Sequence, residues 1–254
     1  MTAVGVDGAR GGWVAASAAP AASGWRTRLE LFADFAALAA AVGDAAIAID
    51  VPIGLLDSVA FRPCDRAARR LLGTRASTVF APPARYMLPA AGDYAAIRRL
   101  VAEERETNPQ AKGLSAQAAG IAAKVREVDD WVRAHPDCER RLFECHPELS
   151  FLALNDGAPL AEPKHTAAGR TRRLELIRLA FPDAEQQLAT APWSAKQTAL
   201  ADLLDAYAAL STALACARGE QQELGEGERD SAGVLMRIAL QPFPSVQDGC
   251  QPLA

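Results

Sequence analysis

Three aspartates that are far apart in the sequence each lie on a small-residue face of a predicted element. Strand alternation places Asp7 on the face that it shares with Gly5, opposite the valines of the opening strand. Asp50 ends an apolar segment, on the face that carries its alanines. Asp205 falls on the alanine side of a long apolar helix, where a carboxylate is out of place unless it has a partner. We therefore expect the three carboxylates to share one site.

Carboxylates placed together in this way would need a cation. Two of them ~5 Å apart repel by ~3 kcal/mol at an effective dielectric of ~20, enough to force proton uptake or to recruit a metal ion. Oxygen ligands without paired cysteine or histidine favour Mg²⁺ or Mn²⁺ over zinc. Two such ions can activate a water and stabilise the leaving oxygen of a phosphodiester. The pattern predicts a catalytic metal site formed by Asp7, Asp50 and Asp205, with Asp202, one turn earlier, as an alternative to the last.

Each aspartate also has a purely structural interpretation. Asp7 could cap the glycine-rich turn at Gly8–Gly12, and Asp50 could cap the turn at Pro52. Asp205 could form a structural ion pair with an arginine. Metal ligation is preferred for Asp7 because of its partners, whereas the two interpretations of Asp50 are balanced.

A second group of polar residues could extend the metal site or contact substrate. Arginines follow helical spacing along one side of the helix predicted at 62–72, and a polar ridge follows the helix predicted at 116–134. The candidates are Glu144 as a further catalytic acid and Arg66, Arg69, Lys124, His146 and Glu148 as substrate contacts. Their structural alternatives are a helix cap for His146, an edge-strand charge for Glu144, an exposed ion pair of Lys124 with Glu127, and solvated faces for the arginines.

The elements that would position these residues alternate between strands and helices, which predicts an α/β fold. Residues 4–14 and 25–32 predict an antiparallel meander. A helix at 35–42, capped by Asp34 and ended by Gly43, leads to a strand at 46–51, which should lie parallel to the first. We expect further helices at 62–72, 94–106, 116–134, 147–154, 166–180 and 196–218, a loop at 75–91 and a short strand at 140–145.

Composition limits the classes of protein that fit. The chain has 254 residues, half of them hydrophobic, and one domain of this size can bury a large core. A net charge of −4 gives no basic field that would concentrate nucleic acid nonspecifically. Five scattered cysteines indicate reduced thiols. We found no signal-like start and no apolar run near the ~18 residues that span a bilayer. These features predict a soluble, cytoplasmic protein with no membrane partner.

Several motifs occur in the order found in the bacterial domain-of-unknown-function 429 family. The sequence resembles this family over roughly residues 4–240. The matching motifs are Gly5-Val6-Asp7-Gly8, Gly11-Gly12-Trp13-Val14, Ile49-Asp50-Val51-Pro52-Ile53-Gly54-Leu55, Cys64-Asp65-Arg66-Ala67-Ala68-Arg69 to Gly73, Lys124 to Asp129, Glu144-Cys145-His146-Pro147-Glu148, Asp202 to Ala206, and Asp230 with Gly233.

The resemblance implies a ribonuclease H-like mixed sheet, with three antiparallel strands followed by parallel ones and helices on both faces. It implies one domain over 1–240 with a helical insertion around 62–135, and a loose tail at 241–254. Members of the family are predicted nucleases, with acids on the first strand, the fourth strand and a late helix. Asp7, Asp50 and Asp205 or Asp202 take those places. This chain departs from the family at Ala201, where a second acid is usual, and at Lys164-His165, where two lysines are usual.

The residues and the resemblance together predict a metal-dependent phosphodiesterase, a nuclease that uses Mg²⁺ or Mn²⁺ on nucleic acid or a nucleotide. Two other classes stay open. The Val6-Asp7-Gly8 turn also resembles the first phosphate loop of actin-like and sugar-kinase-like phosphotransferases, although those enzymes need two such domains. A non-catalytic binding or scaffold protein of the same fold is compatible with the modest net charge and with Ala201.

Overall fold

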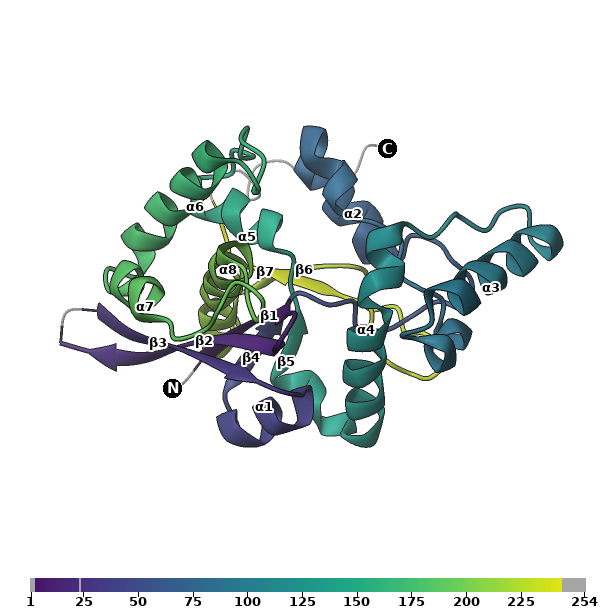
Figure 1. Cartoon of the computed structure of the whole chain (residues 1–254), viewed down its shortest axis with the longest axis horizontal. Coiled ribbons are helices and arrows are strands. Elements are labelled where there is room, and N and C mark those ends of the chain that lie inside the picture. The colour runs from purple at the N-terminus through teal and green to yellow at the C-terminus, as the bar shows by residue number, and fades with distance from the viewer. Residues whose placement is uncertain (1–2, 23, 244–254) are drawn as a thin grey trace. The chain divides into compact units, whose positions relative to one another are not determined.

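The computed structural model describes residues 3–22 and 24–243. The chain forms two compact units, both visible in Figure 1. Among the described residues, unit 1 holds those up to Asp50, residues 140–223 and residues 239–243, and unit 2 holds Val51–Glu139 and Leu224–Ile238. The helical insertion predicted around 62–135 falls within unit 2, and a single domain over 1–240 stays a prediction. Most of the predicted tail lies outside the described residues.

Unit 1 is built on a mixed five-stranded sheet with the strand order β3-β2-β1-β4-β5. The strands β1 (Ala3–Ala9), β2 (Gly12–Ala21) and β3 (Gly24–Phe32) pair antiparallel. β4 (Ala46–Ile49) and β5 (Leu142–Glu144) continue the sheet in parallel with β1. The predicted meander and the parallel fourth strand are confirmed. Both parallel strands are shorter than predicted. β4 ends at Ile49 because the chain then turns toward Pro52, which has no N–H to donate.

The crossover helix α1 (Phe35–Val42) joins β3 to β4, as predicted. The side chain of Asp34 accepts a hydrogen bond from the Ala37 N–H at 2.7 Å, and Gly43 ends the helix with a φ of 57°. Phe35 packs against Trp13 of β2, with ring centroids 5.8 Å apart. Alternation along β2 puts Trp13 on the opposite face from Val14, so α1 covers the face that α8 leaves free.

The helix α8 (Leu200–Arg218) covers the other face of the sheet. It lies directly on the backbone of β1, because a Cβ atom at Gly5 would be 2.0 Å from Leu210 N and 2.2 Å from Ala206 O. The helix begins four residues later than predicted. Asp202 sets this start, since its carboxylate accepts a hydrogen bond from the Ala199 N–H at 2.9 Å.

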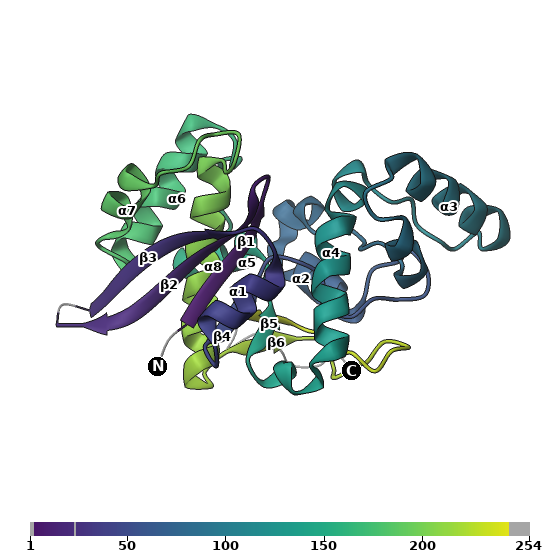
Figure 2. The same cartoon turned by 60° about the horizontal axis from the view of Figure 1, so that its bottom comes forward.

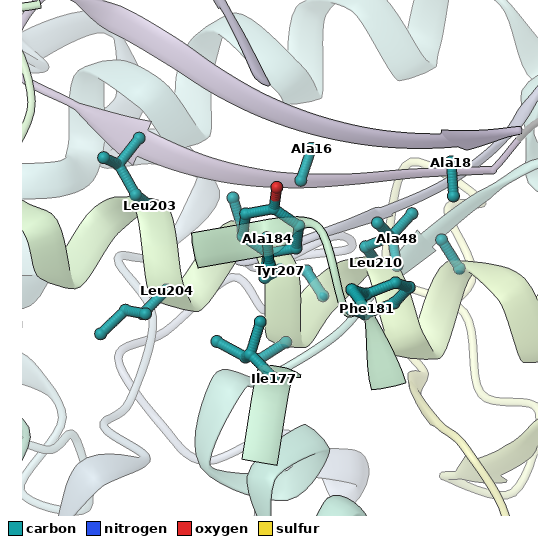
Figure 3. Close-up of a cluster of buried hydrophobic side chains, with 14 of the residues drawn as sticks. Ala16, Ala18, Ala48, Ile177, Phe181, Ala184, Leu203, Leu204, Tyr207 and Leu210 are labelled. Atoms are coloured by element: carbon teal, nitrogen blue, oxygen red, sulfur yellow. The ribbon is translucent and has the colours of Figure 1, made fainter. Parts of the chain in front are cut away.

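The helices α5 (Pro147–Leu154) and α6 (Ala167–Ala180) pack on α8. The helix α7 (Ala184–Thr190), which was not predicted, packs on β3 and α6. Figure 3 shows Ile177 across α8 from the strand that carries Ala16, while the Tyr207 hydroxyl points toward the strands. That hydroxyl lies 2.9 Å from Thr27 Oγ1 of β3. The core of unit 1 therefore surrounds α8, and every residue of the helix from Leu203 to Cys216, Asp205 included, is buried.

The length and apolar character of α8 would also suit a membrane span, although the sequence analysis expected no such run. Most of this helix is buried inside unit 1, as the core helix of a soluble protein is. The finding is therefore weak evidence for a membrane.

Unit 2 is mainly helical (Figure 2). Its helices are α2 (Pro63–Leu72), α3 (Tyr94–Thr107) and α4 (Ala116–Ala134), all within two residues of their predicted bounds. The predicted loop at 75–91 contains parts of two short 3₁₀ helices, η1 (Gly73–Thr78) and η2 (Arg85–Ala90), and a third, η3 (Pro136–Arg140), follows α4. Two strands that were not predicted, β6 (Gln222–Leu224) and β7 (Ile238–Leu240), form a separate two-stranded sheet, most of whose residues belong to unit 1.

A buried ionic network ties the two chain segments of unit 2 together. Arg85 Nη1 lies 2.6 and 2.7 Å from the two carboxylate oxygens of Asp129, and Arg85 Nη2 pairs with Asp230. Asp230 also accepts hydrogen bonds from the N–H groups of Leu55, Ala232 and Val234. The buried Asp230 thus joins the returning segment 224–238 to the rest of the unit, as does the ion pair of Arg229 with Glu139.

Four of the five cysteines are free and buried: Cys64, Cys138, Cys145 and Cys216. Cys250 lies outside the described residues.

Candidate functional site

Asp7 and Asp50 occupy matching positions on neighbouring parallel strands. Val6 of β1 is paired with Ile49 of β4, and the Asp50 N–H donates to the Val6 carbonyl at 3.0 Å. One residue further along each strand, Asp7 and Asp50 face the same side as Gly5 and its partner on β4. That side is the one that α8 covers.

Asp205 reaches the same place from α8. The C-terminal end of α8 lies at the start of β4, because Cys216 packs with Ala46, so the first turns of the helix lie toward the end of β1 that carries Asp7. Asp205 is 2% exposed and Asp7 8% exposed, while Asp50 is half-buried. Two strands and one helix therefore bring the three predicted aspartates together.

Burial dominates the electrostatics of this acidic cluster, by which we mean Asp7, Asp50 and Asp205. Burial raises the pKa of Asp7 well above its ordinary value, and the charges of Asp50 and Asp205 raise it further. The pKa of Asp50 is also raised by burial, although His146 and Lys164 oppose the shift. Burial raises the pKa of Asp205 to about 6, even though Lys164 lowers it. The ionised cluster is short of positive charge.

Lys164 supplies the cation that the structure itself contains. Its Nζ lies 2.9 Å from Asp205 Oδ2, and its side chain is 47% exposed. The charges of Asp205, Asp50 and Asp7 all raise the pKa of Lys164. The ion-pair interpretation of Asp205 is thus found, with a lysine in place of the expected arginine. The sequence comparison noted that Lys164-His165 replaces the two lysines usual in the family, but Lys164 was not assigned to the site.

Asp202 lies at the margin of the acidic cluster. Its carboxylate caps the first turn of α8 through the Ala199 N–H, as described above, and its charge also contributes to the raised pKa of Asp7. The helix cap gives Asp202 a structural role that Asp205 does not have.

Glu148 and His146 lie beside the cluster at the start of α5. Glu148 is buried, and its Oε1 is 2.5 Å from Nη2 of Arg173, which is itself 1% exposed. The charge of Glu148 raises the pKa values of Asp50 and Asp205. His146 Nδ1 accepts a hydrogen bond from the Glu148 N–H at 3.2 Å, which is the capping role that the sequence left open. Sequence reasoning missed Arg173, because nothing in the helical pattern of α6 marks it as buried.

Glu144 belongs to the same region of the sheet. It is the last residue of the edge strand β5 and is 5% exposed. Its charge acts, together with those of Asp50 and Asp7, on the buried thiol of Cys145, whose pKa is raised well above its ordinary value mainly by burial.

The remaining predicted residues lie in unit 2. Arg66 donates to the Phe61 carbonyl at 2.5 Å. Arg69 donates to the carbonyls of Ala76 and Val79 at 2.7 and 2.6 Å, and its guanidinium lies over the Phe61 ring. These contacts give both arginines a local structural role. Lys124 lies on α4. Substrate contact by these three residues stays a prediction.

The donor set of the acidic cluster suits a hard divalent cation, because it consists of carboxylate oxygens in a desolvated place. Among residues 3–22 and 24–243, however, no group of three or more His, Cys, Asp or Glu side chains is arranged to hold a metal ion. Two contacts describe the arrangement that is present instead. Asp7 Oδ1 accepts from the Gly8 N–H at 2.8 Å, as the turn-capping interpretation requires, and Asp205 holds Lys164. The cluster therefore suits a divalent cation by the chemistry of its ligands. A metal ion would have to share Asp205 with Lys164 or displace Lys164.

Comparison with known proteins gives one match. A family model described as "Protein of unknown function (DUF429)" matches residues 5–229. No curated protein and no solved structure matches the chain.

Proposed function

Because the chain belongs to the family described as Protein of unknown function (DUF429), we propose that it has the activity suggested by that resemblance, metal-dependent hydrolysis of phosphodiester bonds in nucleic acid or a nucleotide. The matched segment includes the acidic cluster and Lys164. The proposal includes a ribonuclease H-like fold and a cytoplasmic location, for which the buried free cysteines are suited.

The topology of unit 1 supports the proposed fold. Three antiparallel strands precede two parallel ones, and the order β3-β2-β1-β4-β5 puts the first and fourth strands side by side. A late helix lies on these two strands. Acids on the first strand, after the fourth strand and on the late helix are the arrangement that the resemblance implies.

The observation that carries the proposal is the shared burial of three carboxylates from three distant elements. Their pKa values are all raised, chiefly by burial, and Asp50 and Asp205 both act on Asp7. A structural role alone does not account for such a cluster, because uncompensated buried carboxylates oppose folding. Strongly perturbed acids gathered in one place are typical of functional sites.

The chain's own residues have separate tasks in this mechanism. Asp7 and Asp50 would hold the divalent cation, and the Gly8 N–H fixes the orientation of the Asp7 carboxylate. The bound cation would supply a water of lowered pKa and stabilise charge on the leaving oxygen. Asp205 would complete the ligand set once it separates from Lys164. Arg173 neutralises Glu148, so that this fourth acid adds less negative charge to the site.

The proposal is tested with the full chain on single-stranded DNA, duplex DNA, RNA and bis(p-nitrophenyl) phosphate, in Mn²⁺, Mg²⁺ or EDTA. We expect cleavage that requires the divalent cation and falls at least about 100-fold in Asp7→Asn. Asp44→Asn is the matched control, because Asp44 is exposed in the same unit. Cleavage that survives EDTA, or that Asp7→Asn leaves intact, would contradict the proposal. So would the lack of cleavage of every substrate.

The phosphotransferase alternative gains no support from the β1–β2 turn. A phosphate loop needs open backbone N–H groups, whereas the Gly11 N–H donates to the Gln197 carbonyl at 2.7 Å. Thermal stabilisation by ATP would revive this alternative. A scaffold protein of the same fold would show no carboxylate-dependent binding of Mn²⁺ by calorimetry.

A further inference from the structure

We infer that Lys164 is the residue that binds the substrate's phosphate, and that Asp205 holds it in place until a divalent cation enters the acidic cluster. The inference rests on the proposed function and adds a substrate-binding residue to it. It starts from the ion pair between Lys164 Nζ and Asp205 Oδ2 at 2.9 Å.

The backbone around Lys164 is held firmly by α6. A Cβ atom at Gly169 would lie 2.0 Å from the Pro163 carbonyl oxygen, so the chain before Lys164 packs directly on the first turn of that helix. The Thr166 N–H and hydroxyl donate to the same carbonyl at 3.0 and 2.8 Å. Arg173 donates to the Glu162 carbonyl at 3.0 Å. Position 164 is therefore fixed beside the cluster by the two residues that precede it.

The side chain of Lys164, in contrast, is only partly committed. About half of it is exposed, and its ammonium makes one hydrogen bond to the residues that the structure describes, the one to Asp205. An ammonium has three donors and no fixed plane, so it can turn to a new acceptor without moving the backbone. Asp50 and Asp7 attract the same ammonium, which keeps it at the cluster.

Charge explains why the ammonium would change partners. Three ionised aspartates and one lysine carry two net negative charges, which repel a phosphodiester. Asp205 would be shared between Lys164 and a divalent cation, whose charge would cancel this excess. The Lys164 ammonium, released from Asp205, would then have its donors free, and a phosphate oxygen is the acceptor that a lysine point charge suits. Arg173 is not available for this role, because it is buried on Glu148.

The test measures two affinities by calorimetry in the full chain: that for Mn²⁺ alone, and that for thymidine 5′-monophosphate at saturating Mg²⁺. We expect Lys164→Met to bind Mn²⁺ about tenfold more tightly and the nucleotide at least tenfold more weakly. Lys164→Arg should keep nucleotide affinity within about threefold. Arg26→Met is the control, because it also removes one positive charge but from an exposed position. Arg26 lies on β3, five residues from the β3 residue that shares a row of the sheet with Asp7. This substitution should change neither affinity more than twofold.

Opposite changes in the two affinities separate this role from a structural ion pair. If Lys164 only holds Asp205 in position, Lys164→Met weakens Mn²⁺ binding, and the inference is overturned. It is also overturned if nucleotide affinity is unchanged. If the wild type binds no Mn²⁺, the proposed function and the inference are both overturned. If the wild type binds Mn²⁺ and Lys164→Met binds it with the same affinity, the inference alone is overturned. Circular dichroism checks folding, and Lys164→Gln carries the same test if Lys164→Met does not fold.

Discussion

Single residues of the acidic cluster are governed by burial more than by pairing. Burial is the largest cause of the raised pKa of Asp7, Asp50 and Asp205, and Lys164 offsets only part of it. In the metal-free protein, the ionised form of these side chains therefore opposes folding. The resulting loss of stability can be measured without knowing the substrate.

Asp7→Asn should stabilise the metal-free protein at pH 7.5. The amide has nearly the same shape and can still accept the Gly8 N–H, but it carries no charge to desolvate or to repel Asp50 and Asp205. We expect the unfolding midpoint in EDTA to rise by about 2–4 °C, the shift that ~1 kcal/mol gives in a chain of this size. Stabilisation by Mn²⁺ should be lost in the same variant. A lower midpoint, or Mn²⁺ stabilisation equal to that of Asp44→Asn, would count against the cluster.

Stability of the metal-free protein should also depend on pH through Asp205. Its folded-state pKa of about 6 lies above the ordinary 3.8, so the folded state binds the proton more tightly than the unfolded state does. Tighter proton binding by Asp205 in the folded state therefore contributes up to about 3 kcal/mol to the free energy of unfolding. This contribution is fully present below about pH 4 and is lost as the pH rises to about 6. Thermal melts in EDTA between pH 4 and pH 7 should show this loss, and Asp205→Asn should flatten the slope. An unchanged slope in that variant would assign the dependence to other groups.

Sequence patterns located the acids of the site but not its cations. Asp7, Asp50 and Asp205 stand out because strand alternation and helical periodicity put a charge where small residues pack. Lys164 lies in the irregular segment between α5 and α6, where no helical or strand periodicity indicates the direction of a side chain. The environment of Arg173 depends on Glu148 and Glu162, which are close to it only in three dimensions.

At the scale of elements, the contact of α8 with β1 decides where the acids meet. Gly5 permits it, since any Cβ there would overlap the helix backbone. We expect Gly5→Ala to lower the free energy of unfolding by about 3 kcal/mol or more, because backbone on both sides must move. Urea denaturation measures the change. Gly120→Ala is the control, since nothing lies within 4 Å of its Cβ position, and it should stabilise α4 by about 0.5–1 kcal/mol. A mild effect of Gly5→Ala would mean that α8 sits further from β1.

Local signals predicted elements well where a cap or turn marks the boundary. Asp34 and Ser115 each cap the helix expected after them, and Pro147 opens α5 as predicted. Thr166, expected as the first residue of its helix, is the cap of α6. Prediction failed where tertiary contacts decide. The helix α7 is short, and the strands β6 and β7 have three residues each. The late start of α8 is a different case, because it is set by the local cap between Asp202 and Ala199.

At the scale of the whole molecule, the chain leaves unit 1 after Asp50 and again after Glu223. A buried ionic network joins the two chain segments of unit 2. Arg85→Met would leave Asp129 and Asp230 buried without that partner, with side chains 3% and 0% exposed. We expect unit 2 to lose about 3–5 kcal/mol. Hydrogen exchange should show the loss of protection within 51–139 and 224–238.

Arg133→Met provides the control for this prediction. Arg133 also pairs with Asp129, but it is 48% exposed, so its loss should cost less than about 1 kcal/mol. Equal effects of the two substitutions, or loss of protection across unit 1 as well, would show that the network does not act within unit 2 as described.

The contact between Gly5 and Leu210 has a consequence for synthesis on the ribosome. The opening strands emerge first, yet the helix that covers them is made some two hundred residues later, a delay of roughly 10–40 s at 5–20 residues per second. Until then a nascent chain exposes the face that carries Asp7 and lacks Asp205. Products of premature termination before this helix should therefore be prone to aggregation and unable to assemble the three acids.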